Sequence, residues 1–243
     1  MYSIGVLCIC YPTAARLYYA DQQTTVATAF EENLNVVPQE ELEGMREAAE
    51  EYNASLSYVG GAGGISPQQE EIYNNLLTYN ETSAMGIVVI PKINVNLPIY
   101  HGTDQTALQV GVGHIASSSL PIGGKGTHCV LSAHSGMADS TMFDQLDRLE
   151  IGDTFSIISL GETLVYQVDQ IKVVLPEETE DLFIDPNQDY CTLITCTPYG
   201  VNSHRLLVRG VRVENTEEVE QATLQSQQQI EKSTEPDWAK IVL

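Results

Sequence analysis

The 243-residue chain is 43% hydrophobic, which is enough for a packed core and excludes a wholly disordered protein. Its 33 acidic and 11 basic side chains give a net charge of −22. This argues against nucleic-acid binding, because such proteins neutralise phosphates with Lys and Arg. Five cysteines are too few for a disulfide scaffold in a chain of this length.

The acidic residues are unevenly distributed along the chain. Residues 31–81 hold eleven carboxylates and one basic residue, and residues 214–237 hold seven and one. Residues 86–213 are nearer balance, with fourteen acidic and seven basic residues. This pattern predicts one folded domain flanked by acidic, solvated extensions.

The N-terminal segment opens with a mostly apolar stretch, residues 1–11, which is shorter than the roughly 20 residues that a membrane-spanning helix needs. It also lacks the basic residues that usually begin a secretory signal. We interpret residues 1–23 as part of a membrane anchor with its juxtamembrane segment, the alternative being a buried or fraying helix. The apolar residues 238–243 could begin a second anchor.

Residues 24–84 form a predicted helical segment. Two polar helical stretches, 25–53 and 67–79, are separated by a run of Gly and Ala at residues 60–64. Five such small residues do not hold a helix, so they predict a hinge or a surface loop.

Residues 85–213 change to short β-type runs, most of them bounded by Gly, Pro, Asn or Asp, which are typical of strand ends. Eight strands with only two short helices, at 103–110 and 141–149, favour a barrel or a sandwich. Residues 214–243 are predicted to be an acidic, Gln-rich tail, with residues 221–229 extending away from the core. The predicted strands are 86–90, 95–99, 112–115, 127–133, 154–160, 163–174, 190–195 and 206–213.

Two of these strands end in a reactive side chain. The strand at 127–133 runs into His134, the strand at 190–195 runs into Cys196, and a third strand begins beside Arg205. Side chains at strand ends are held rigidly at the rim of a sheet, where a substrate can reach them.

These three residue types suit acyl transfer through a thiol. A nearby imidazolium favours the nucleophilic thiolate, and the same ring can protonate a departing amine. The guanidinium of Arg205 is permanently charged and can donate several hydrogen bonds to the oxyanion of a tetrahedral intermediate. Arg209, on the same strand face, is its rival. Without further context, a lone Cys such as Cys196 is usually a small buried apolar residue.

The motifs around these residues resemble the sortase family. The block TLITCTPYG at 192–200, with Arg205 nine residues after Cys196, resembles the active-site strand of sortases, and LSAHSG at 131–136 resembles the segment that carries the histidine. The remaining matches occur in the family's order and bring the resemblance to residues 85–213: PKINVNLPIYHG at 91–102, GVGHI at 111–115, SLPIGGKGT at 119–127 and GETLVYQV at 161–168.

The resemblance implies an all-β fold: a closed eight-stranded sortase-type barrel with short helices and an N-terminal helical extension. It is strongest to class C, the pilin-polymerising sortases. It implies a cysteine transpeptidase that cleaves a Leu-Pro-x-Thr-Gly-like sorting signal between Thr and Gly. The resulting acyl-thioester on Cys196 would pass to a Lys amine of a pilin.

The same resemblance implies a membrane-associated enzyme with an extracellular catalytic domain, in a Gram-positive-type cell. We expect it to be a monomer that needs no cofactor or metal. The alternatives are a housekeeping-type sortase that anchors proteins to cell-wall peptide, or a catalytically idle, β-rich surface or scaffold protein.

Class C sortases carry a lid over the active site, usually with an Asp-Pro-aromatic plug. No such motif occurs in residues 46–80, so we expect a lid around residues 57–66 with Tyr58 as its plug. Ser135 stands where the family commonly has Arg after the catalytic histidine. We predict that Ser135 and Thr195 contribute to substrate binding.

The remaining cysteines and histidines have structural explanations. Cys129 and Cys191 each lie five residues before a predicted catalytic residue. This odd offset places them on the opposite face of their strands, where we predict buried free thiols rather than a strained disulfide. The other histidines lack zinc-finger spacing and are expected to be structural. They are His101, His114, His128 and His204.

Overall fold

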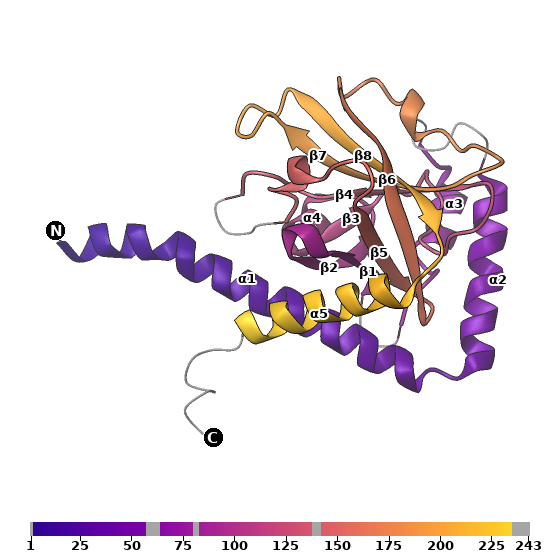
Figure 1. Cartoon of the computed structure of the whole chain (residues 1–243), viewed down its shortest axis with the longest axis horizontal. Coiled ribbons are helices and arrows are strands. Elements are labelled where there is room, and N and C mark those ends of the chain that lie inside the picture. Colours follow the sequence, from indigo (N-terminus) through magenta and orange to yellow (C-terminus); the bar gives the residue numbers. More distant parts are fainter. Residues whose placement is uncertain (1, 57–63, 80–82, 138–141, 235–243) are drawn as a thin grey trace.

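The structure is a computed structural model, and it describes residues 2–56, 64–79, 83–137 and 142–234. Three helices come first along the chain: α1 (Tyr2–Val36), α2 (Gln39–Ser55) and α3 (Pro67–Tyr73). The eight strands follow, and helix α5 (Glu217–Thr234) comes last in the described chain (Figure 1).

The strands close into a barrel in the order β1-β2-β3-β4-β7-β8-β6-β5. Two neighbouring pairs, β2–β3 and β4–β7, are parallel, and the other pairs are antiparallel. The closed eight-stranded barrel is therefore confirmed, and each of the eight predicted ranges contains a strand. The strands are β1 (Ala84–Ile90), β2 (Val95–His101), β3 (Val112–His114), β4 (Thr127–Ser132), β5 (Thr154–Ser159), β6 (Glu162–Val174), β7 (Asp189–Thr197) and β8 (His204–Val213).

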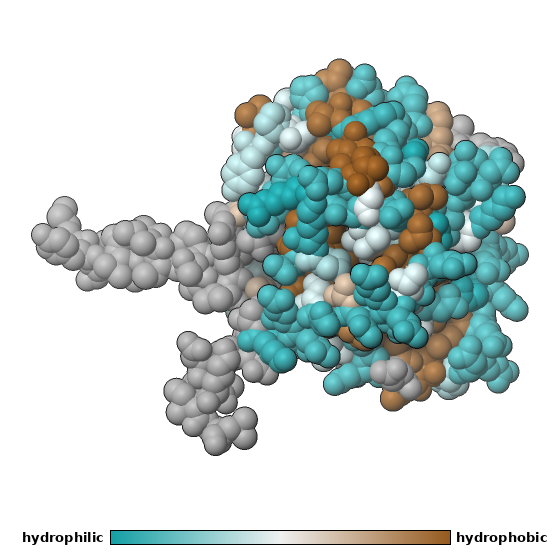
Figure 2. All heavy atoms as spheres, viewed as in Figure 1, coloured by the Kyte–Doolittle hydropathy of each residue, from teal (hydrophilic) through white to brown (hydrophobic). Residues whose placement is uncertain are grey.

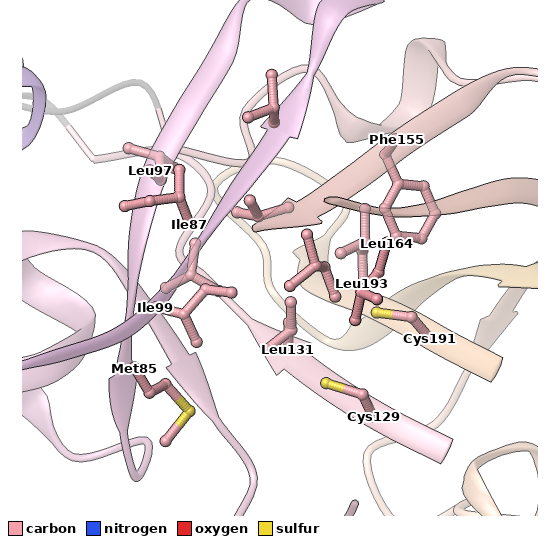
Figure 3. Close-up of a cluster of buried hydrophobic side chains, with 14 of the residues drawn as sticks. Met85, Ile87, Leu97, Ile99, Cys129, Leu131, Phe155, Leu164, Cys191 and Leu193 are labelled. Carbon is pink, nitrogen blue, oxygen red and sulfur yellow. The ribbon is translucent and has the colours of Figure 1, made fainter. Parts of the chain in front are cut away.

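The barrel interior is filled by alternate residues of the strands, because successive side chains of a strand point to opposite faces. Figure 3 shows inward side chains of β4 and β7 among the core residues Met85, Ile99 and Phe155. A second, smaller apolar cluster lies on the outer face of β4, β7 and β8, under the β6–β7 loop. Its buried members are Val130, Leu182, Ile194 and Leu207.

The two inward cysteines of β4 and β7, Cys129 and Cys191, are directly paired in the parallel register (Figure 3). Both are buried and free, which confirms the sequence prediction. Burial raises the pKa of the Cys191 thiol well above its ordinary value, so this thiol remains protonated in the core.

Helices α1 and α5 lie alongside each other against the barrel wall (Figure 1). Gln227 Nε2 of α5 donates to Glu31 Oε1 of α1 at 2.5 Å, and the Thr223 hydroxyl lies 3.2 Å from Ser156 Oγ of β5. The prediction that residues 221–229 extend away from the core is therefore wrong. The helix buries small polar residues against polar partners, and the visible face that includes it is largely hydrophilic (Figure 2).

A second prediction, the helix at 141–149, is also wrong. Within its described part, residues 142–149 form turns and one short 3-10 helix, η2 (Leu146–Arg148). The Phe143 amide, near the start of this range, donates to the His134 carbonyl at 3.0 Å. The other predicted short helix is present as α4 (Gln105–Val110). Among the described helices, none is long and apolar enough to cross a membrane.

Three histidines of the barrel strands are hydrogen-bonded; His114 and His128 are buried, and His101 is half-buried. His101 Nε2 lies 2.8 Å from the Leu76 carbonyl, and His114 Nδ1 lies 2.9 Å from the Tyr73 hydroxyl. His128 Nε2 lies 2.7 Å from Thr192 Oγ1. Burial lowers the pKa of His101 and of His128 to about 4. No group of three potential metal ligands occurs within the described parts of the chain.

These buried histidines predict acid sensitivity. As the pH falls from 6.5 towards 4, the unfolded chain binds protons that the folded chain excludes. The free energy of unfolding should therefore decline with pH, by on the order of 3 kcal/mol per histidine at the lower limit. Urea unfolding from pH 7 to 4.5 should show a shallower decline for His128→Gln than for the wild type. The less buried His204→Gln should match the wild-type slope, and equal slopes in all three proteins would contradict the prediction.

A second stability prediction tests the docking of α1. Phe30 is fully buried, with its ring 4.9 Å from that of Tyr79. Phe30→Ala should lower the free energy of unfolding by about 3–5 kcal/mol, through lost burial and the cavity that remains. Tyr18→Ala, on an exposed part of the same helix, should change it by about 0.5 kcal/mol or less. Equal urea midpoints for the two variants would mean that α1 does not pack against the barrel.

Candidate active site

Cys196 and Arg205 face each other across two neighbouring strands. Cys196 is the second-last residue of β7, and Arg205 is the second residue of β8. They are directly opposite in the antiparallel β7–β8 register. Directly opposed residues point to the same face of a sheet, with β-carbons about 4.5–5.5 Å apart. The thiol and the guanidinium therefore start from adjacent points on the outer face of the barrel.

His134 reaches the same place from the other side of β7. Strand β4 is parallel to β7, and its last described pair is Ser132 with Ile194. The Ala133 amide extends the ladder by donating to the Ile194 carbonyl at 3.1 Å. Extending the parallel register by two residues beyond the Ser132–Ile194 pair brings His134 next to Cys196. Both residues are half-buried. The parallel register thus brings together residues that are far apart in the sequence.

Side-chain hydrogen bonds fix the backbone around this pair. Ser135 Oγ donates to the Cys196 carbonyl at 2.6 Å, and Thr195 Oγ1 donates to the Ala133 carbonyl at 2.9 Å. The loop that follows is held at the Gly136 amide, which donates to Asp144 Oδ1 at 2.6 Å. The segment after β4 is therefore fixed to β7 at several points.

The hydrogen bonds of Ser135 and Thr195 change the interpretation of both residues. Thr195 is buried, and its hydroxyl is bonded to the backbone of the neighbouring strand. Its hydroxyl is therefore engaged by this bond, and its predicted role in substrate binding stays a prediction. The Ser135 hydroxyl is likewise bonded to the backbone. Both side chains join β4 to β7, a function that a sequence motif does not reveal.

The structure separates the two arginines of β8. Arg209 makes a two-pronged ion pair with Asp169, at 3.0 and 2.7 Å, and its guanidinium lies 4.2 Å from the ring centre of Tyr190. Arg205 Nη1 instead donates to the backbone carbonyls of Asn202 and His204, at 3.2 and 3.1 Å. Four strand residues place Arg209 about 13 Å further along β8. Arg205 is thus the arginine beside Cys196, and Arg209 is committed to an ion pair.

The other cysteines and histidines of these strands are not placed for catalysis. Cys129 and Cys191 are inside the barrel, and His128 is fully buried. The His128 ring connects the sheet to the β6–β7 loop, because its Nδ1 lies 2.9 Å from the Phe183 carbonyl. Of the three cysteines whose side chains the structure describes, Cys196 alone is not fully buried.

Both flanks of the expected lid rest on the barrel. At the end of α2, the Tyr52 hydroxyl donates to the Ala116 carbonyl at 2.7 Å, and Asn53 Oδ1 accepts from the Leu120 amide at 2.7 Å. On the other flank, Tyr73 of α3 bonds to His114. The proposed plug, Tyr58, lies outside the described residues.

Sequence reasoning missed two side chains beside His134. Tyr199, in the β7–β8 loop, is 63% exposed and lies next to Gly136. Asp144 accepts a hydrogen bond from the amide of the same glycine. Tyr199 lies within the TLITCTPYG block, but no residue pattern pointed to Asp144.

Comparisons with known proteins agree with this geometry. The family model for the sortase domain matches residues 88–213. Sortase D of Bacillus subtilis (strain 168) is 33% identical over 157 residues, covering 63% of this chain and 76% of that protein. Two solved structures have the same fold. Sortase C1 from Streptococcus agalactiae is 44% identical, with a TM-score of 0.74 over 78% of this chain and 98% of that one.

The second structure, sortase C1 of GBS Pilus Island 1, is 40% identical, with a TM-score of 0.72 over 80% of this chain and 94% of that one. The resemblance to class C sortases is therefore confirmed. Sortases are cysteine transpeptidases that act on sorting-signal substrates and amine acceptors. From its barrel, its family match and these neighbours, the chain belongs to the sortase family and is a sortase-type cysteine transpeptidase.

Proposed function

We propose that Cys196 is the nucleophile, His134 the proton carrier and Arg205 the stabiliser of the tetrahedral intermediate. The observation that carries this assignment is the direct pairing of Cys196 with Arg205, with His134 two residues past the end of β4, the other strand that pairs with β7. The thiol thus lies between a proton carrier and a fixed cation, on the accessible face of the barrel.

The proposed reaction has two half-reactions. The Cys196 thiolate attacks the carbonyl between Thr and Gly of a Leu-Pro-x-Thr-Gly-like signal, and the Arg205 guanidinium stabilises the oxyanion. The His134 imidazolium protonates the departing amine, which leaves a thioester on Cys196. Neutral His134 then takes the proton of an incoming amine, whose attack forms an amide and releases the thiolate.

A Lys of a pilin subunit is the acceptor that we propose. The support is the similarity to sortase C1 of GBS Pilus Island 1, together with the long helical segment before the barrel. A housekeeping-type sortase, which uses a cell-wall peptide amine, is the alternative. We place the catalytic barrel outside the membrane of a Gram-positive-type cell.

We further propose that residues 57–63 act as a lid with Tyr58 as its plug. The fixed flanks of this segment support the idea. Tyr52 and Asn53 at one end, and Tyr73 at the other, bond to the chain between β3 and β4 or to β3 itself. Strand β3 pairs with β4, the strand that leads to His134.

The catalytic assignment predicts a covalent adduct. Incubation with a sorting-signal peptide should add the mass of its acyl part to Cys196, and Cys196→Ala should show no adduct. Arg205→Lys should slow adduct formation about 100-fold or more, because the ammonium is a point charge and lacks the planar set of donors of the guanidinium. Arg209→Lys, four residues along the same strand, is the matched control and should retain most of the wild-type rate.

Two outcomes of this experiment would contradict the assignment. If the wild type and Cys196→Ala behave alike, the protein is an idle member of the fold. If Arg209→Lys loses more activity than Arg205→Lys, the two arginines have been assigned the wrong way round. Supplying a pilin Lys peptide or a cell-wall peptide amine to the acyl-enzyme then distinguishes the two acceptor classes.

The lid predicts restricted access to Cys196. A variant that tests the lid should leave helix α2 unchanged, because Ala49 and Tyr52 of this helix are buried. Replacing residues 57–63 with seven alternating Gly and Ser residues should increase the rate of Cys196 labelling by a thiol reagent several-fold. Tyr58→Ala should give part of this increase.

The labelling is best measured with Cys8 and Cys10 replaced by Ser, because Cys129 and Cys191 are buried and Cys196 then reports alone. Tyr18→Ala, on exposed α1, is the control for loss of a tyrosine. An unchanged labelling rate in the Gly-Ser variant would mean that nothing in residues 57–63 covers the thiol.

A further inference from the structure

The β7–β8 loop and the segment after β4 meet at Gly136, beside His134. A β-carbon added at Gly136 would lie 3.4–3.6 Å from three ring atoms of Tyr199. The glycine has a φ of +83°, a conformation that favours glycine, so the ring can approach the backbone closely here. Tyr199 is nevertheless 63% exposed, so most of its surface is open to a ligand.

A carboxylate contacts the same glycine. Asp144 is half-buried, and its Oδ1 accepts from the Gly136 amide at 2.6 Å. Its Oδ2 has no hydrogen-bond partner in the described ranges of the chain. An exposed aromatic ring and a half-buried carboxylate therefore both contact one exposed glycine.

This pair has the chemistry of an ammonium site. A lysine ammonium is attracted to the face of a tyrosine ring and to a carboxylate oxygen. Within the described residues, the basic side chain nearest the reaction centre is Arg205, on the opposite side of β7. Asp144 and Tyr199 thus favour a bound cation on the β4 side of Cys196. Arg205 favours an oxyanion on the β8 side.

We propose that Tyr199 and Asp144 form the subsite that holds the lysine side chain of the acceptor before it attacks the thioester. This inference rests on the proposed function and names the site of its second substrate. The bound ammonium loses one proton to solvent, and the neutral amine attacks the thioester carbon. A C–N bond forms, the C–S bond breaks with its electron pair going to Cys196, and the second amine proton goes to His134.

The position relative to His134 explains why an acceptor, rather than the sorting signal, would bind here. His134 takes a proton from the incoming amine, so the amine must approach from the β4 side. Gly136 is two residues beyond His134, in a loop that is fixed to the Cys196 carbonyl through Ser135. The subsite and the base are therefore held by the same short segment.

The test compares two nucleophiles on the preformed acyl-enzyme of the full chain. Nα-acetyl-lysine amide is cationic, whereas hydroxylamine is small and uncharged at neutral pH. The readout is the ratio of their second-order rate constants, in which any change in acylation cancels. Asp144→Asn retains an oxygen for the Gly136 amide and removes the charge, and it should lower the ratio about threefold.

Tyr199→Leu should also lower the ratio about threefold, because it keeps apolar volume and loses the ring. Tyr199→Phe should restore a ratio close to that of the wild type. Asp147→Asn, an exposed acid three residues from Asp144, is the matched charge control and should leave the ratio unchanged.

The outcomes separate this inference from the proposed function. If Asp144→Asn and Tyr199→Leu give the wild-type ratio on a normally formed acyl-enzyme, the subsite is wrong and the proposed function stands. An equal fall in the rate constants of both nucleophiles would also overturn the subsite, since it indicates damage to His134 or Cys196. If the wild type forms no acyl-enzyme with sorting-signal peptides, the proposed function fails and this inference fails with it.

Discussion

The parallel pairing of β4 with β7 is the constraint on which the site depends. It brings Cys129 opposite Cys191 and Leu131 opposite Leu193, and all four side chains are buried inside the barrel. Side chains alternate along a strand, so a shift of one residue would turn Cys196 inward and expose the apolar set. The buried inner pairs therefore fix the register that presents His134 and Cys196 side by side on the outer face. The same β4–β7 register therefore both buries the core residues and places His134 and Cys196 on the outer face.

The outer face is maintained by a different set of contacts. Val130, Ile194 and Leu207 form an apolar cluster beneath the β6–β7 loop, and His128 holds this loop through the Phe183 carbonyl. Because the His128 ring is buried and has a lowered pKa, it remains neutral near pH 7 and holds the loop without a buried charge. Ser135 and Thr195 then join the two strand ends beyond the last ladder pair. The side chains of the proposed active site thus extend from a backbone held on both sides of the sheet.

Sequence patterns gave a good account of the barrel and of the residues at its rim. Strand alternation and turn residues located all eight strands, and strand ends with family motifs located Cys196, His134 and Arg205. Contacts distant in sequence were not accessible in this way. The Phe143 amide bonds to the His134 carbonyl, nine residues back in the chain, and α5 buries Thr223 and Gln227, which look like residues of a solvated tail. The choice between Arg205 and Arg209 likewise required Asp169, whose position across β8 no local pattern shows.

The connection between the N-terminal helices and the site follows from where α2 and α3 are attached. Tyr52 bonds to Ala116, Asn53 bonds to Leu120, and Tyr73 bonds to His114, all within β3 or the chain that leads from β3 to β4. These bonds attach the end of α2 and helix α3 to the barrel. The attached helices are also packed into the fold, because Ala49, Tyr52 and Tyr73 are buried. The contacts that attach α2 and α3 to the barrel are therefore separate from the β4–β7 register that presents Cys196.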